Sequence, residues 1–280
     1  MNLRPLSPQR YARALRRRTP MPVKRFARRL LEVTAPPAPV DPAEAAAPST
    51  YADLYEQHAI EHPPETSIGG GDFDRMGQIE LAILTDAGLK PSSTLLDFGC
   101  GTGRLAVHAI PFLTDGQYIG TDISPTMLVH AEALVSGRLG SVPANARFVV
   151  QPDETFPVDA PVDFMCAYSV FTHMEHEDTY RYLRAALAAS TAETTFVASV
   201  LQLDMLVHQH EFLVSAGKTV EERWATVRNV VTSEVLFTTV AQLAGWTVTR
   251  WIPVTESAGT MPDGERVGVG QSIVIMRPSA

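Results

Sequence analysis

The chain has 280 residues, of which 45% are hydrophobic and 19% are charged, a composition that excludes collagen, coiled coil and wholesale disorder. The formal net charge is −8, and since the first 48 residues hold ten basic and three acidic side chains, the remainder is strongly acidic and unsuited to a nucleic-acid partner. Two cysteines, Cys100 and Cys166, are too few for a disulfide framework and suit a reducing, cytoplasmic location.

The first 34 residues form a basic tail. Apolar residues recur in it at helical spacing between basic ones, at Val23, Phe26, Ala27, Leu30 and Leu31. This pattern predicts a basic amphipathic helix, for peripheral contact with an anionic membrane or a protein, or else a flexible solvated arm. Residues 35–48 are almost all Pro and Ala, which indicates a linker. We therefore expect a tail over 1–34, a linker over 35–48 and the folded domain over 49–280.

From residue 50 onward, short apolar runs alternate with amphipathic stretches, a pattern typical of an α/β sheet with mostly parallel strands. The expected fold is doubly wound and Rossmann-like, with seven strands and helices on both faces. A long insertion follows the fifth strand. Helices are predicted at 72–89, 104–113, 125–136, 177–189 and 234–244. Strands are predicted at 94–98, 118–121, 147–150, 162–168, 195–201, 246–252 and 272–276.

The most informative motif is a glycine-rich loop after the first predicted strand, with the sequence LLDFGCGTGR over residues 95–104. Gly99, Gly101 and Gly103 alternate there, and a backbone without Cβ atoms lets a ligand approach closely. Asp97 stands at the loop entrance, and Asp122 ends the next strand. An acid at that position can accept both hydroxyls of a ribose. The motif therefore predicts a nucleoside ligand.

The loop departs from a dinucleotide site in two respects. The G-x-G-x-x-G fingerprint would place glycine where this chain has Arg104, and Asp97 would lie close to a pyrophosphate. S-adenosylmethionine has a ribose, an ammonium and a sulfonium but no phosphate, so it suits the two acids better. Two alternatives remain: an NAD(P)-dependent oxidoreductase, and a non-catalytic cofactor-binding protein tethered by its basic tail.

Residues 95–104 resemble motif I of class I S-adenosylmethionine-dependent methyltransferases, and YIGTDISP over 118–125 resembles the acidic motif that follows. VDFMCAYSVFTH over 162–173 is similar to the fourth-strand motif of a bacterial branch associated with polysaccharide, glycan or small-molecule methylation. The resemblance implies S-adenosyl-L-methionine as cofactor. It implies that Asp97 lies near the methionine, that Asp122 binds the ribose and that Ile123 packs on the adenine. Further cofactor contacts are implied at Gly99, Gly101, Thr102, Gly103 and, at the sulfonium end, Tyr168.

One position departs from the family pattern. The family has Asp or Asn just after the third strand to meet the adenine amino group, whereas this chain continues with Gln151, Pro152 and Asp153. Gln151 could accept that hydrogen bond, or Asp153 could do so after a shifted turn. Upstream, residues 51–71 could form a lid hinged at Gly69 to Gly71, or a simple capping helix.

Methyl transfer needs chiefly an aligned acceptor, and a hydroxyl acceptor also needs a base, for which histidine is suited. His173 follows the fourth strand and is the first candidate, although it could instead orient a loop. His208 and His210 lie in the insertion and could contact the acceptor or be exposed. No metal site is expected. The sequence thus predicts an S-adenosylmethionine-dependent enzyme that O-methylates a sugar, a glycan or another small hydroxylated acceptor.

Overall fold

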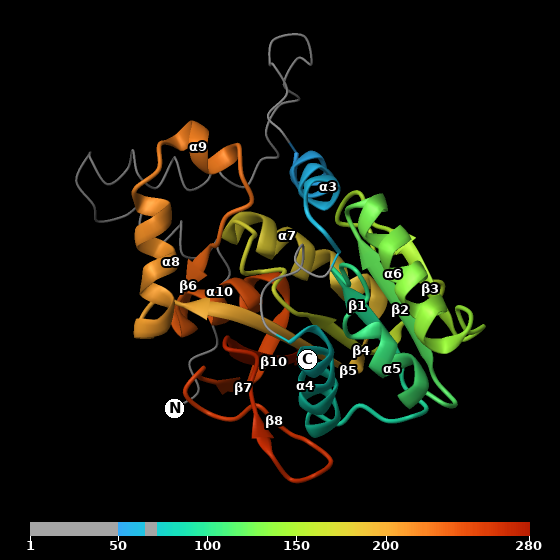
Figure 1. Cartoon of the computed structure of the whole chain (residues 1–280). Coiled ribbons are helices and arrows are strands. Elements are labelled where there is room, and N and C mark those ends of the chain that lie inside the picture. Colours follow the sequence, from blue (N-terminus) through green and yellow to red (C-terminus); the bar gives the residue numbers. More distant parts are fainter. Residues whose placement is uncertain (1–49, 65–71) are drawn as a thin grey trace, which may run out of the picture. The chain divides into compact units, whose positions relative to one another are not determined.

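The computed structural model describes residues 50–64 and 72–280 (Figure 1). The expected basic tail, the expected linker and the expected glycine hinge lie outside these described residues. No helix in the described part of the chain is long and apolar enough to cross a membrane.

The main sheet confirms the doubly wound prediction. Its strand order is β3-β2-β1-β4-β5-β10-β7, and the short strand β6 pairs with β5 as an eighth member. Strands β1 to β5 pair in parallel, whereas β10 runs antiparallel to β5 and β7. The strands are β1 (Thr94–Phe98), β2 (Gln117–Asp122), β3 (Ala146–Val150), β4 (Val162–Ala167), β5 (Ser190–Gln202), β6 (Val231–Thr232), β7 (Trp246–Ile252) and β10 (Ser272–Pro278).

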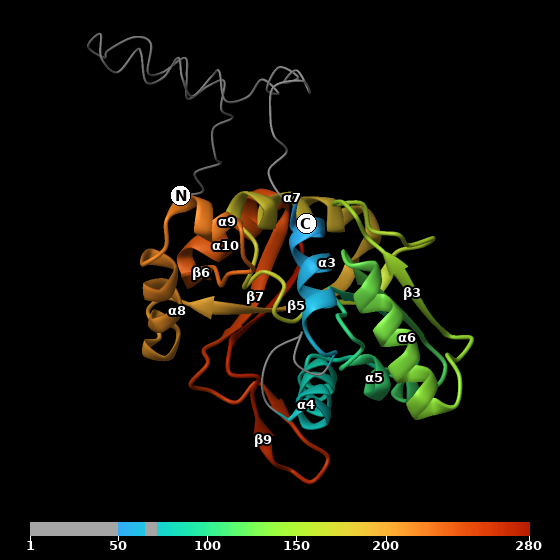
Figure 2. The same cartoon turned by 45° about the horizontal axis from the view of Figure 1, so that its top comes forward.

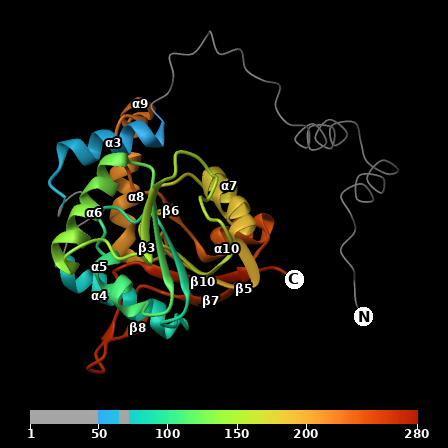
Figure 3. The same cartoon turned by 90° about the vertical axis from the view of Figure 1, so that its right-hand side faces the viewer.

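Helices cover both faces of this sheet. Successive side chains of a strand point to opposite faces, so Leu95 and Leu96 of β1 enter different apolar cores. Leu95 packs in a core with residues of α4 and α5, and Leu96 packs in a core with residues of α7 and α10. The two helix layers are seen on either side of the strands in Figure 3. Their members are α4 (Phe73–Asp86), α5 (Ala106–Phe112) and α6 (Pro125–Leu139) on one face, and α7 (His176–Ala186) and α10 (Glu234–Ala244) on the other.

Local signals explain where several helices begin and end. Ser124 caps α6 by accepting a hydrogen bond from the Met127 amide, and Pro125 takes the first helical position, where its fixed φ is favourable. Ser233 caps α10 in the same way, and Gly245 ends it with φ 95°, a conformation that glycine adopts readily. The predicted helix over 234–244 is confirmed with its bounds unchanged, because both of its caps are local.

The insertion after β5 folds into elements that the sequence pattern does not separate. Helices α8 (Leu206–Ala216) and α9 (Val220–Trp224) precede β6, and a small hairpin of β8 (Gly259–Thr260) and β9 (Arg266–Val267) follows β7. The hairpin lies close to α4, since a Cβ atom on Gly259 would stand 2.8 Å from the Ile83 amide nitrogen. The segment before α4 forms the helix α3 (Tyr51–Glu61), which contacts α6 (Figure 2).

Candidate functional site

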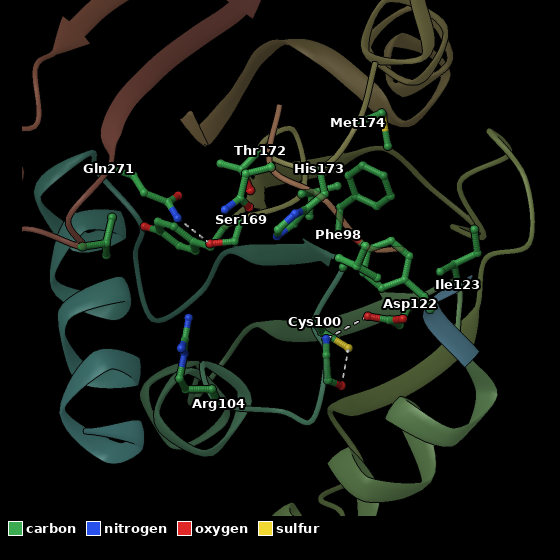
Figure 4. Close-up of a pocket in the computed structure, with 18 of the residues that line it drawn as sticks. Phe98, Cys100, Arg104, Asp122, Ile123, Ser169, Thr172, His173, Met174 and Gln271 are labelled. Carbon is green, nitrogen blue, oxygen red and sulfur yellow. Dashed lines mark hydrogen bonds between the residues drawn. The ribbon is translucent and has the colours of Figure 1, made fainter. Parts of the chain in front are cut away.

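A cavity of about 610 Å³ lies at the carboxyl ends of β1, β2 and β4, where open α/β sheets bind their ligands. Figure 4 shows Ser169, Thr172, His173 and Gln271 on one side of it, and Cys100 and Asp122 on another. The chain before α4 also contributes to its lining through Tyr51, Tyr55 and His58 of α3. The cavity thus joins the glycine-rich loop to the turn after β4.

The glycine-rich loop between β1 and α5 requires its glycines. Gly99, Gly101 and Gly103 have φ values of 72°, 54° and 87°, a region that other residues rarely adopt. A Cβ atom on Gly99 would also stand 2.5 Å from Cγ2 of Val170. Of the residues predicted to bind cofactor here, Gly99 and Gly101 line the cavity. Thr102 and Gly103 are not among its lining residues, and the Thr102 hydroxyl instead donates to the Pro64 carbonyl oxygen.

Asp122 ends β2 and is fixed by the backbone of two loops. Its Oδ2 accepts from the Gly101 amide and its Oδ1 from the Ser124 amide, each at 2.9 Å. Burial raises the pKa of this carboxyl to about 6, against the lowering effect of the amide hydrogen bonds. A carboxylate oxygen can accept more than one hydrogen bond, so Asp122 can still receive hydroxyls from the cavity.

Asp97 is buried near the end of β1, and its carboxylate accepts hydrogen bonds from two buried side chains. Its Oδ2 accepts from the Tyr118 hydroxyl at 2.6 Å, and its Oδ1 accepts from the Cys166 thiol at 3.4 Å. Burial raises the pKa of this carboxyl to about 7, while the hydrogen bond from Tyr118 opposes the shift. The residue lines the cavity, so a cation bound there would favour its charged form.

The structure separates the two candidates for the adenine contact. Gln151 is 2% exposed and lines the cavity, and neither of its side-chain amide atoms has a hydrogen-bond partner. Asp153 is exposed, and its carboxylate accepts from the Thr155 amide. Buried polar groups are nearly always paired in folded proteins, so the unpaired amide of Gln151 is available to a ligand in the cavity.

Two other predicted cofactor residues, Ile123 and Tyr168, also line the cavity. The Tyr168 hydroxyl donates to the Glu80 carbonyl oxygen at 3.0 Å, which fixes the ring. The buried Glu80 carboxylate pairs with Arg104. Sequence reasoning did not find this ion pair, since nothing in the spacing of Glu80 and Arg104 shows that α4 packs against the glycine-rich loop.

Helix α3 is fastened to the site by one carboxylate. Glu56 accepts from the hydroxyls of Ser124 and Thr126 at 2.6 and 2.5 Å, and from the Thr126 amide at 3.2 Å. These hydrogen bonds lower the pKa of Glu56. At the start of the helix, the Tyr51 hydroxyl accepts from the Glu175 amide. The sequence allowed either a lid or a capping helix here. In the structure, α3 is anchored to the start of α6 and to the start of α7.

His173 lines the cavity just beyond β4. Its Nδ1 lies 2.9 Å from the Arg228 carbonyl oxygen. A carbonyl can only accept, so Nδ1 carries the proton and the lone pair is left on Nε2. Burial lowers the pKa of the ring, which keeps it neutral at pH 7. A neutral imidazole with this tautomer can accept a proton from a hydroxyl.

The other two candidate histidines are placed differently. His208 is 3% exposed, and both of its ring nitrogens are used: Nδ1 accepts from the Gln202 amide at 2.9 Å, and Nε2 donates to the Gly270 carbonyl oxygen at 3.0 Å. It lines the cavity, but no lone pair is left for a proton. His210 is exposed and is not among the lining residues. The geometry therefore favours His173 as the base.

The cavity fits S-adenosylmethionine. Gly99 and Gly101 offer backbone that a ligand can approach, Asp122 offers oxygens to the ribose, and Gln151 offers a buried amide without a protein partner. Asp97 and Asp122 also line the cavity and would face the positive groups of this ligand. The described lining residues include four acids, Glu80, Asp97, Asp122 and Glu211, and no lysine, so the cavity suits a cation rather than a pyrophosphate.

Comparison with known proteins agrees with this chemistry. Residues 96–193 match the methyltransferase domain family. A malonyl-[acyl-carrier protein] O-methyltransferase of Magnetococcus marinus is 33% identical over 82 residues, which cover 29% of each chain. Cyclopropane mycolic acid synthase 1 of Mycobacterium tuberculosis is 32% identical over 103 residues, which cover 37% of this chain and 34% of the relative. The matched region thus spans about a third of the length of these curated relatives.

Solved structures share the fold. Magnesium protoporphyrin IX methyltransferase from Synechocystis PCC 6803, solved with bound SAH, has a TM-score of 0.53 at 18% identity over 75% of this chain and 90% of its own. Mitomycin 7-O-methyltransferase has a TM-score of 0.60 at 16% identity over 80% of this chain and 60% of its own. These likenesses confirm the Rossmann-like fold. The family match adds that residues 96–193 resemble a methyltransferase domain.

Proposed function

We propose that the chain is an active S-adenosylmethionine-dependent methyltransferase, and that it O-methylates a small, neutral, hydroxylated acceptor such as a sugar or a glycan residue. One observation carries the proposal: a single cavity joins the nucleoside cradle of Gly101 and Asp122 to the neutral imidazole of His173. The cradle holds the cofactor, and the imidazole serves the acceptor.

Bound S-adenosylmethionine supplies a methyl carbon that its sulfonium makes electrophilic. The residues of the chain do the rest by positioning and proton transfer. Asp122 and Gln151 hold the nucleoside, while Asp97 and the ring of Tyr168 define the end where the methionine lies. His173, with its proton on Nδ1, receives the acceptor's hydroxyl proton on Nε2. The Arg228 carbonyl then stabilises the protonated ring by keeping its hydrogen bond to Nδ1.

The charges around the cavity favour a neutral acceptor. Asp97, Asp122 and Glu211 line it, whereas Arg104 is the one arginine among its described lining residues and is paired with Glu80. A phosphate or carboxylate on the acceptor would meet these acids without a new cationic partner. Sugars and other polyols avoid this repulsion.

The names of several similar proteins agree with transfer to oxygen, since a malonyl-[acyl-carrier protein] and a mitomycin O-methyltransferase are among them. The oxidoreductase alternative finds no support in the site, because Arg104 stands where a dinucleotide loop needs glycine and is bound to Glu80. The peripheral membrane contact expected of the basic tail remains part of the proposal, as a property separate from the cavity.

Titration calorimetry of the full chain against S-adenosylmethionine, S-adenosylhomocysteine and NAD tests the cofactor. We expect the first two to bind and NAD not to bind. An assay of S-adenosylhomocysteine release over neutral hydroxylated acceptors and over amines then tests transfer to oxygen. Tight binding of NAD, or methylation of the amines alone, would contradict the proposal.

A further inference from the structure

We infer that Gln271 and Thr172 form a second hydroxyl-binding subsite beside His173, so that the acceptor is a polyol or a polyhydroxylated ring and not a compound with a single hydroxyl. The inference rests on the proposed function, since it concerns the acceptor end of the same cavity. It adds to that function a requirement for a second hydrogen-bond donor on the acceptor.

Besides the amide of Gln151, two further buried polar atoms of the described cavity lining lack a hydrogen-bond partner. Thr172 is 1% exposed and its Oγ1 has no hydrogen bond, and Oε1 of Gln271 is buried and unpaired as well. Both residues line the cavity. An unpaired buried polar atom costs free energy in a folded protein, and hydroxyls of a ligand in the cavity would remove that cost.

The turn after β4 holds the side-chain amide of Gln271 in place. Ser169 has φ 57°, a strained value for a residue other than glycine, and its amide donates to Ser199 Oγ at 2.7 Å. Its own Oγ accepts from Nε2 of Gln271 at 2.9 Å, as Figure 4 shows. The nitrogen end of the Gln271 amide is therefore occupied, and its oxygen end is left for the cavity.

The backbone next to Gln271 is held by His208. The Nε2 of His208 donates to the carbonyl oxygen of Gly270, and its Nδ1 accepts from the amide of Gln202 at the end of β5. Gly270 has φ 73°, so the chain turns sharply just before β10. This connection explains why a buried histidine lines the cavity although it has no lone pair for catalysis.

The chemistry of the two atoms defines the ligand. An amide oxygen can only accept, so Gln271 needs an O–H or N–H from the acceptor, while Thr172 can donate or accept. His173 takes the proton of the hydroxyl that is methylated. The acceptor must therefore carry at least one further donor beside the reacting hydroxyl, and the acids Asp97 and Glu211 in the same lining disfavour an anionic one.

The first test compares acceptors. Initial rates of the full chain are measured with myo-inositol, methyl glucopyranoside and catechol, and with the single-hydroxyl compounds cyclohexanol and phenol. We expect turnover to be confined to the polyhydroxylated compounds. Equal or better turnover of cyclohexanol or phenol would overturn the inference, and so would no turnover of the whole panel by a chain that binds S-adenosylmethionine. Failure to bind S-adenosylmethionine would instead overturn the proposed function.

The second test changes the subsite, using the best polyhydroxylated compound of the panel. Gln271→Met keeps the length of the side chain but removes the amide, and Thr172→Val removes one hydroxyl. Each is expected to raise KM about 3- to 10-fold with kcat largely kept, the usual effect of one lost neutral hydrogen bond. Gln271→Glu keeps an accepting oxygen and should stay closer to wild type.

Thr121→Val is the matched control, because Thr121 Oγ1 is also buried and unpaired but lies outside the cavity lining. Its KM should be unchanged. Affinity for S-adenosylhomocysteine should be the same in all four variants, which shows that they are folded. A KM for Gln271→Met and Thr172→Val equal to that of the control would overturn the inference.

Discussion

Two buried carboxyl groups give the cofactor end of the cavity its electrostatic character. Burial raises the pKa of Asp97 to about 7 and that of Asp122 to about 6, so both groups are partly protonated near neutral pH. A bound cation favours the charged form and lowers these pKa values. Binding of a cationic cofactor must therefore release protons in this range.

Affinity for S-adenosylmethionine is therefore expected to rise with pH between about 5 and 8. Below the raised pKa values the carboxyls must lose protons before they can attract the ligand, so acid weakens binding. Calorimetry in buffers of different ionisation enthalpy measures both the affinity and the protons released. The variant Asp97→Asn should release fewer protons and show a shallower dependence. A slope equal to that of wild type would contradict the role given to Asp97.

His173 is expected to act on the chemical step. If His173 is the base, the variant His173→Ala should slow single-turnover methyl transfer by roughly 10²- to 10⁴-fold. Its affinity for the cofactor should be nearly unchanged. The wild-type rate should rise with pH through a pKa below the ordinary value of about 6.5, because burial lowers the pKa of this ring. A variant with a raised KM, near-normal kcat and the same pH profile would show that the ring only shapes the acceptor site.

The roles of single residues were only partly predictable. The spacing after the third strand left Gln151 and Asp153 as equal candidates, and only the fold shows that Gln151 is buried at the cavity while Asp153 is exposed. The pattern could not distinguish His208 from His210 either. The difference lies in the partners of His208, which come from β5 and from the loop before β10, far apart in the chain.

At the level of elements, prediction succeeded where the signal was local. The strand over 94–98 and the helix over 234–244 have the expected bounds, because a buried apolar run or a serine and glycine cap marks them. The strands β6, β8 and β9 have two residues each. Such strands form only because a neighbour in the folded chain offers hydrogen bonds. Two residues are too few to show the alternating hydrophobic pattern from which a strand is predicted.

The attachment of α3 gives an element-scale prediction. Glu56 is the carboxylate that ties this helix to the start of α6, and Tyr55 and His58 of the same helix line the cavity. Glu56→Ala should therefore loosen the helix and speed dissociation of S-adenosylhomocysteine, by several-fold for a lost charged hydrogen bond. Stopped-flow dissociation measures this rate.

Glu61→Ala is the control for that variant, since Glu61 lies on the same helix and its carboxylate accepts from Gln57 within α3. Its dissociation rate should match wild type. Equal dissociation rates for both variants would show that α3 does not retain the ligand, and a loss of cooperative unfolding in Glu56→Ala would show that the helix is needed for the fold itself.

At the scale of the whole molecule, the basic tail and the apolar cores occupy different parts of the chain. Ten of the 23 basic residues lie in the first 30 positions, which hold no acidic residue, whereas the two apolar cores of the described part of the chain consist of residues after position 50. The described lining of the cavity also begins at Tyr51. Composition predicts that the tail and linker are separate from the folded domain, because a stretch of Pro and Ala has few groups with which to build a core.

Deletion of residues 1–48 is therefore expected to leave cooperative unfolding and the affinity for S-adenosylmethionine unchanged. If the tail also binds membranes, the full chain should bind vesicles that contain anionic lipid and the truncated chain should not, since each basic residue near such a surface contributes about 1 kcal/mol. Binding to vesicles should weaken as the salt concentration is raised, because screening shortens the range of these charges.

Thermal unfolding, calorimetry and vesicle co-sedimentation measure the three properties. A truncated chain that unfolds without cooperativity would show that the body depends on the tail, and equal vesicle binding by both chains would place the membrane contact on the acidic body instead.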